Sequence, residues 1–209
     1  MRIGMNQSVL LLSFAAIASA CGDGTAPGGG GGTTFDSLPG IAILSGIVQS
    51  DGTVSDSANV FAGDVDNAFP GRNTRGFLSF DLSAIPAGKT VLTANLKVFQ
   101  ASVSGDPFSS LGSVVVDHLT YGNSLDLADY TGGTLTSGFD TLSIDGVAGS
   151  RLISVLQQVK ADLAAGRQNT QYRIRFSTQD GDNDGISDAV LFRDEEDFPP
   201  PIIIISFSN

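Results

Sequence analysis

Residues 75–99 read RGFLSFDLSAIPAGKTVLTANLKVF and contain two alternating apolar runs separated by a Pro-Ala-Gly sequence. In the first run, Leu78, Phe80 and Leu82 fall on one side of an extended chain. The second run, residues 91–99, alternates in the same way, with apolar side chains at Leu92, Ala94, Leu96 and Val98. Because successive side chains of a strand point to opposite faces, both runs predict β-strands with one face in a hydrophobic core.

The chain after residue 35 continues in short apolar runs, with Gly, Pro, Asn or Asp about every ten residues. Such spacing is typical of a β-sandwich or β-barrel. An Asp-Gly turn at residues 51–52 predicts a hairpin, and the last apolar run predicts a strand buried on both faces. We expect further strands at residues 41–49, 53–54, 113–121, 134–144, 171–177 and 202–207.

One segment has helical rather than strand periodicity. Residues 150–165 place apolar side chains at helical spacing, and Gly166 follows as a residue that tolerates the left-handed conformation of a helix end. The apolar positions are Leu152, Val155, Leu156, Val159 and Leu163. The sequence therefore predicts an all-β antiparallel fold with one amphipathic helix packed on it.

The 209-residue chain is acidic and poor in charge, with 22 acidic against 11 basic residues and a formal charge of −11. All acidic residues except Glu195 and Glu196 are Asp, which favours turns and cation-binding loops. Phosphate contacts need Lys and Arg, so this balance argues against a nucleic-acid partner.

The first twenty residues carry Arg2 near the start and then an apolar run from Val9 to Ala20. This run is too short for a membrane span and predicts a signal peptide. Cys21, the single cysteine, follows Ala-Ser-Ala in a stretch that resembles a bacterial lipobox, which implies lipidation; an ordinary secretory signal with an incidental thiol is the alternative. Residues 21–34 contain the cysteine and a Gly-rich tether, and residues 35–209 form the domain. We expect an exported lipoprotein held at the outer membrane or cell surface.

The order of these segments resembles the DNRLRE-type domain, through residues 72–99 and through the late helix, YRIRFST and the final strand within residues 145–207. The resemblance implies a jelly-roll β-sandwich found in exported bacterial proteins. It also implies a noncatalytic role, since the family includes carbohydrate-binding modules that recognise alginate. An acidic polysaccharide of the cell envelope or the extracellular space is the expected ligand.

Basic and aromatic side chains are the candidates for contact with an acidic polymer. Lys97, Arg173 and Arg175 alternate with core residues and should therefore lie on outward strand faces, where a local cationic strip forms despite the net charge. The full set of ligand-binding candidates is Arg72, Arg75, Lys97, Tyr172, Arg173 and Arg175.

Residues 180–188 read DGDNDGISD, with carboxylates at positions one, three, five and nine and Gly at six. Several oxygen ligands around a sharp Gly turn are what calcium requires, and the order resembles one calcium-binding repeat of the thrombospondin type-three kind. The alternative is a solvated acidic hairpin loop, and Asp64, Asp66 and Asn67 form a weaker metal candidate. The predicted ligands are Asp180, Asp182, Asp184, Ile186 and Asp188.

No arrangement of residues predicts catalysis. His118 shares a strand face with Val114 and Val116, which indicates a satisfied, partly buried imidazole, and no nucleophile turn is present. The favoured hypothesis is a noncatalytic polysaccharide-binding domain stabilised by calcium. The alternatives are an accessory subunit that docks on a larger envelope protein complex and, less favoured, a polysaccharide lyase.

Overall fold

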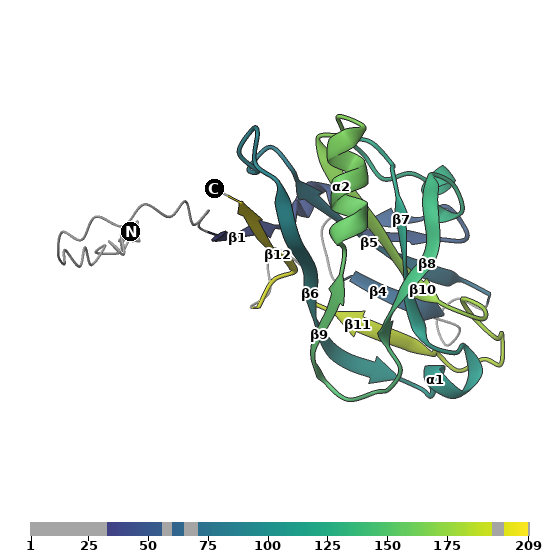
Figure 1. The fold of residues 1–209 in the computed structure, drawn as a ribbon. Helices are drawn as coiled ribbons and strands as arrows, with labels where there is room; N and C mark the ends of the chain where they lie inside the picture. Colours follow the sequence, from purple (N-terminus) through teal and green to yellow (C-terminus); the bar gives the residue numbers. More distant parts are fainter. Residues whose placement is uncertain (1–32, 56–59, 65–70, 194–198, 209) are drawn as a thin grey trace, which may run out of the picture. The chain divides into compact units, whose positions relative to one another are not determined.

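The computed structural model describes residues 33–55, 60–64, 71–193 and 199–208. The strands of these residues form one antiparallel sheet, which curls to give an all-β, jelly-roll-like sandwich with a helix against it (Figure 1). Residues 31–209 make up one compact unit that contains the entire hydrophobic core described below. Because the unit holds its own core, we expect it to fold without the preceding residues.

The elements follow one another with short connections. The strands are β1 (Thr33–Pro39), β2 (Gly46–Gln49), β3 (Val54–Ser55), β4 (Val60–Asp64), β5 (Asn73–Asp81), β6 (Val91–Ser104), β7 (Val114–Leu119), β8 (Thr134–Ser143), β9 (Gly149–Ser154), β10 (Asn169–Phe176), β11 (Ala189–Phe192) and β12 (Ile202–Ser208). The helical elements are η1 (Ala42–Leu44), α1 (Pro107–Ser110), η2 (Leu127–Tyr130) and α2 (Leu156–Ala164).

The strand order is β1-β12-β6-β11-β4-β5-β10-β7-β8, with β9 paired to β6 and the β2–β3 hairpin paired to β5. One face of this curled sheet encloses the main core, to which Val155, just before α2, and Val159 of α2 contribute. A smaller apolar cluster lies on the opposite face of β5 and contains Leu44, Val48, Phe77, Leu119 and Tyr121. Strand β5 is therefore buried on both faces.

Most of the predicted strands are confirmed, including the hairpin turn at residues 51–52 and the alternation of Leu78 and Phe80 into the core. The strand expected at residues 41–49 is wrong in its first half, because Ala42–Leu44 form η1 and only Gly46–Gln49 form a strand. One position of β6 differs from expectation. Leu92 is exposed and Val91 is buried, because the register against β12 shifts between Ser206 and Phe207. Such a bulge moves the neighbouring side chains to the other face.

The predicted helix of residues 150–165 is wrong in its first third. Residues up to Ser154 form β9, which pairs with β6, and the helix runs only from Leu156 to Ala164 before Gly166, whose φ is +67°. In β9, Ile153 enters the core and Leu152 points outward. A short apolar run fits either periodicity, and pairing to a long neighbouring strand decides it.

The structure also revises the ends of the chain. The tether was expected to extend to residue 34, but Thr33 and Thr34 already belong to β1 and lie opposite Ser208 and Phe207. The last strand lies between β1 and β6, with Ile203 and Ile205 in the core, while its other face is half-buried. Sequence patterns did not predict β1 or β4.

Candidate functional site

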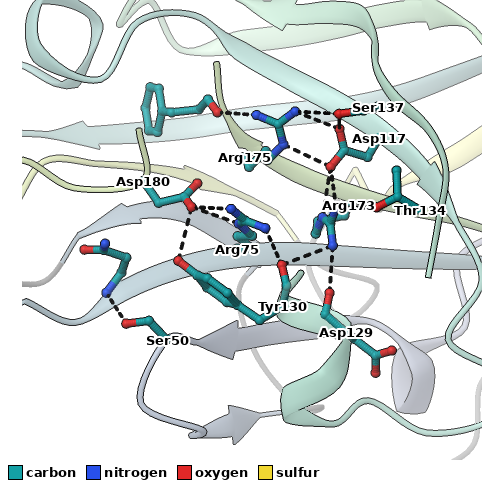
Figure 2. A network of polar contacts seen from close by, with 12 residues as sticks. Ser50, Arg75, Asp117, Asp129, Tyr130, Thr134, Ser137, Arg173, Arg175 and Asp180 are labelled. Carbon is teal, nitrogen blue, oxygen red and sulfur yellow. Dashed lines mark hydrogen bonds and ion pairs between the residues drawn. The ribbon is translucent and has the colours of Figure 1, made fainter. Parts of the chain in front are cut away.

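Three of the predicted ligand-binding arginines lie together on the outer face of β5 and β10. We call Arg75, Arg173, Arg175, Asp117, Asp180 and Tyr130 the arginine network (Figure 2). Register brings it together, because Arg173 lies opposite Phe77 of β5 and Asp117 of β7. The question for function is whether these cations are available to a ligand.

Asp117 binds two arginines at once. Its Oδ2 accepts from Nε and Nη2 of Arg173 at 2.9 and 2.7 Å and from Nε of Arg175 at 2.9 Å, while the Gly138 N–H donates to Oδ1 at 2.7 Å. Burial opposes ionisation of Asp117, but the bonds from Arg175, Gly138 and Arg173 outweigh it and hold its pKa below the ordinary value. Asp117 is therefore a buried, ionised anchor.

The remaining N–H groups of Arg173 donate to the segment that precedes β8 and to the first residue of that strand. Nη1 reaches the carbonyls of Asp129, Tyr130 and Gly132 at 2.8, 3.1 and 3.2 Å. Nη2 also donates to the Thr134 hydroxyl at 2.7 Å. The Arg173 guanidinium ties this segment to the sheet and is only 3% exposed.

Arg75 forms the second half of the network. Its Nε and Nη2 donate to Asp180 Oδ2 at 2.9 and 2.6 Å, and its guanidinium carbon lies 4.3 Å from the centre of the Tyr130 ring. The Tyr130 hydroxyl also donates to Asp180, at 3.2 Å. Burial, followed by the charge of Asp180, raises the pKa of Tyr130 above its ordinary value. The phenol therefore stays protonated.

The expectation that Arg173 faces outward is wrong, since tertiary contacts cover that face of β10. Tyr172 is fully buried in the core, where its hydroxyl accepts from Thr170 at 2.8 Å, and burial raises its pKa. Arg72 pairs with Asp51 at 2.7 Å at the hairpin. Of the six candidates, Lys97 alone has no ion pair or hydrogen bond from its side chain within the described ranges, and this side chain is half-buried.

The predicted calcium loop is held by internal contacts. Asp180 pairs with Arg75, and Asp188 accepts from the Asp106 N–H at 2.6 Å and the Ser110 hydroxyl at 2.7 Å. Asp64 accepts from the N–H groups of Asp182 and Asp188 at 3.3 and 2.9 Å.

The carboxylates of Asp182 and Asp184 each accept a backbone N–H two residues on, from Asp184 at 3.3 Å and from Ile186 at 2.7 Å. Within the part of the chain that the structure describes, no three His, Cys, Asp or Glu side chains converge on one point. In this arrangement, Asp182 and Asp184 are the main source of carboxylate oxygens in the loop that could bind a cation. The calcium site remains a prediction.

His118 is buried and bonded, as expected. Its Nε2 lies 2.8 Å from Oδ2 of Asp162, a fully buried residue of α2, whose Oδ1 accepts from Arg167 at 2.8 Å. This contact fastens α2 to β7. Nothing in the residue pattern pointed to Asp162, because a carboxylate on a helix is ordinarily on its solvated side.

A second surface, which sequence reasoning found only in part, lies on the outward face of β1, β12, β6 and β9; we call it the β6 face. The residues between its positions, such as Leu38, Ile203, Leu96 and Ile153, enter the core, so their neighbours point outward. Register groups these neighbours into cross-strand rows. The rows are Pro39–Ile202–Lys97–Leu152, Ser37–Ile204–Asn95–Ser154, Phe35–Ser206–Thr93 and Phe99–Ser150.

The β6 face combines apolar side chains with two cations. Phe35 is 72% exposed and Leu152 is 60% exposed. A groove of about 220 Å³ is lined by Lys97, Val98, Phe99, Ser150, Pro199, Pro200 and Ile202. Arg193 lies over the Phe99 ring, with its guanidinium carbon 4.4 Å from the ring centre. Counting by twos from Lys97 places Phe99 on this face, whereas no pattern places Arg193 there.

Several predicted positions lie outside the described residues. These are the signal peptide, Cys21, Asp66, Asn67, Glu195 and Glu196. None of the helices that the structure describes is long and apolar enough to span a membrane. No family model matches the chain, and no curated protein matches its sequence.

Proposed function

We propose that this chain is a noncatalytic, exported lipoprotein domain that binds an acidic polysaccharide of the cell envelope or the extracellular space on its β6 face. The observation that carries the proposal is the groove lined by Lys97 and Phe99 on an outward sheet face, with the guanidinium of Arg193 over the Phe99 ring. The chain as a whole carries −11, so two cations beside an aromatic ring stand out against their surroundings.

The chemistry of the groove suits a uronate-containing polymer. A sugar ring packs its C–H edges on apolar rings, here those of Phe99, Pro199 and Pro200, while its carboxylate pairs with a nearby cation. Rows of hydroxyl and amide groups on the same face, such as Thr93 and Asn95, supply hydrogen bonds to sugar hydroxyls. Binding here needs none of the arginines held by Asp117 and Asp180.

The anchor belongs to the same proposal. Lipidation of Cys21 and the Gly-rich segment after it would hold the domain near a membrane while leaving the β6 face free to reach a polymer. Mass spectrometry of the protein purified from a bacterial envelope tests this point. A diacylglyceryl mass on a chain that begins at Cys21 supports the anchor, and a mature chain without lipid contradicts it.

The binding test compares residues 31–209 with two variants that remove one lysine each. We expect alginate or polyguluronate oligomers to bind the unaltered domain and Lys97→Ala to weaken binding by about 1.5–3 kcal/mol, the value of a charge-assisted hydrogen bond. Lys160→Ala removes the same charge from the exposed side of α2 and should leave the affinity unchanged. Isothermal titration calorimetry measures all three.

A second function is favoured by a different property of the same face. The exposed side chains of Leu152 and Phe35 lie on this face together with the half-buried Ile202 and Ile204, and a group of apolar side chains of this kind is typical of protein interfaces. In that case the chain is an accessory subunit docked on a larger envelope protein. A photo-crosslinking residue at position 152 would then capture one defined protein that the same residue at position 160 does not, while oligomers of uronate fail to bind.

A further inference from the structure

A polar cleft at the opposite end of α2 from β9 has the features of a separate ligand site. It lies where β7 ends and β10 begins and is lined by Gly122 and by the side chains of Thr120, Asn123, Arg167, Gln168, Asn169 and Gln171. We call it the α2–β10 cleft. Every one of these side chains carries a hydrogen-bonding group, unlike the groove beside Lys97.

Both walls of the cleft are fixed by buried contacts. Gln171 holds the loop after β7, because its amide donates to the Gly122 carbonyl and accepts from the Tyr121 N–H, each at 2.8 Å. On the other side, Arg167 Nη1 donates to the buried Asp162 at 2.8 Å, and His118 holds the second oxygen of that carboxylate. The guanidinium is therefore oriented before any ligand arrives, which is the arrangement of a supported binding group.

The remaining polar groups of the cleft are available. The side chains of Thr120, Asn123, Gln168 and Asn169 make no hydrogen bonds within the described ranges, and Arg167 uses one of its guanidinium donors. Amide and guanidinium groups that converge on one cleft can donate to and accept from adjacent hydroxyls of a ligand. The volume of about 180 Å³ is below the roughly 300–1,000 Å³ of drug-sized ligand sites, so one small ring is the appropriate size.

The charges around the cleft argue for a neutral ligand. Asp162 already neutralises Arg167, and Asp81 lies opposite Asn169 in the sheet register, on the same face of the two strands. An anion would meet this carboxylate and the overall negative charge of the chain. We infer that the α2–β10 cleft binds a single neutral sugar residue through its hydroxyls, independently of the acidic polymer proposed for the β6 face.

The test is a titration of 15N-labelled residues 31–209 with glucose, galactose, mannose and glucuronate, followed by NMR. For at least one neutral hexose we expect saturable shifts of the side-chain amide signals of Asn123, Gln168 and Asn169, with a Kd of about 1 mM. Asn169→Ala should weaken that binding about tenfold, the loss of one well-placed hydrogen bond. Gln157→Ala removes an exposed carboxamide of α2 that does not line the cleft, and it should not change the binding.

Three results would overturn the inference. One is the absence of saturable shifts with every neutral hexose, and another is an unchanged Kd in Asn169→Ala. The third is a preference for glucuronate over the hexoses, which would assign the cleft to anions. Because Lys97→Ala leaves the cleft intact, loss of polymer binding in that variant and loss of hexose binding in Asn169→Ala separate the two sites.

Discussion

Asp117 is the residue on which the outer face of β10 depends. It is fully buried, it accepts from both Arg173 and Arg175, and it keeps the segment before β8 in place through Arg173. A buried ion pair adds little compared with apolar packing, but removing one partner leaves an uncompensated charge in the protein. Losing this carboxylate therefore lowers the free energy of unfolding by much more than an ordinary surface ion pair contributes to it.

We expect Asp117→Asn to lower the free energy of unfolding by about 3–5 kcal/mol at pH 7, because two guanidinium groups lose their counter-charge. The chain has no Trp, so urea unfolding is followed by circular dichroism. Asp140→Asn, at a half-buried aspartate on β8 that has no ion pair among the described residues, is the matched control and should cost less than about 0.5 kcal/mol.

The same carboxylate gives a pH dependence with a definite sign. Its folded pKa is below the ordinary value, so its contribution is complete above the unfolded pKa of about 3.9 and disappears as pH falls through the lower folded pKa. Between pH 5 and pH 2 the unaltered domain should lose more stability than Asp117→Asn does. Equal losses in the two proteins would show that Asp117 is not the group responsible.

At the scale of elements, β12 shows how one strand serves two surfaces. Ile203 and Ile205 enter the core, while Ile202 and Ile204 lie on the β6 face beside Lys97 and Asn95. The sequence run is apolar throughout, so its pattern predicts burial on both faces and does not show which side is open. Pairing with β6, whose outward residues include Lys97, is what identifies the outer side.

Two neighbouring isoleucines test this assignment. Ile205→Ala should lower the free energy of unfolding by about 2–5 kcal/mol, because it opens a cavity between the sheet and its core. Ile204→Ala removes the same atoms from the half-buried outer face and should cost about 1 kcal/mol or less. Chemical denaturation of both variants measures the difference, and equal costs would mean that the outer face is covered as thoroughly as the inner one.

The loop of residues 180–188 is either a calcium site or a solvated acidic hairpin loop, and thermal unfolding distinguishes the two. If it takes the ion, 1 mM calcium should raise the Tm of residues 31–209 relative to the chelated protein, by an amount that grows with calcium concentration. Asp182→Ala and Asp184→Ala should each abolish the increase, because these two carboxylates are free of ion pairs among the described residues. Asp140→Ala serves as the control. A Tm that is the same with calcium and with chelator would leave the acidic hairpin interpretation.

Alternation, turns and chain breaks were sufficient to predict the class of the fold and most of its strands, because each rests on local geometry. They failed where a distant partner decided the outcome, as at Ser150–Ser154, which pairs with β6, and at Leu92, which a bulge turns outward. The candidate site was harder to predict, because contacts with distant parts of the chain also decide which side chains are exposed. Arg173 occupies an outward strand position, yet a segment about 40 residues earlier in the chain covers it.

At the scale of the whole molecule, the charge of −11 opposes an acidic ligand even if the β6 face attracts it locally. The Debye length falls from about 30 Å at 0.01 M salt to about 8 Å at 0.15 M, so added salt screens the distant carboxylates more than the contacts in the groove. We expect the association rate constant with uronate oligomers to rise severalfold over this range. Surface plasmon resonance measures it, and a rate that falls with salt would indicate that Lys97 and Arg193 dominate the approach.

The pairing of β1 with β12 at the end of the sheet determines how the domain would respond to mechanical force. A polymer held on β6 and a tether that enters at Thr33 would load the chain in opposite directions, and the load would reach β1 at its first pair, Thr33 with Ser208. Strand β1 would then separate from β12 one residue pair at a time, beginning at Thr33. The seven residues of β1, once separated, would add about 23 Å of extended chain to the tether before the force reached the remaining sheet.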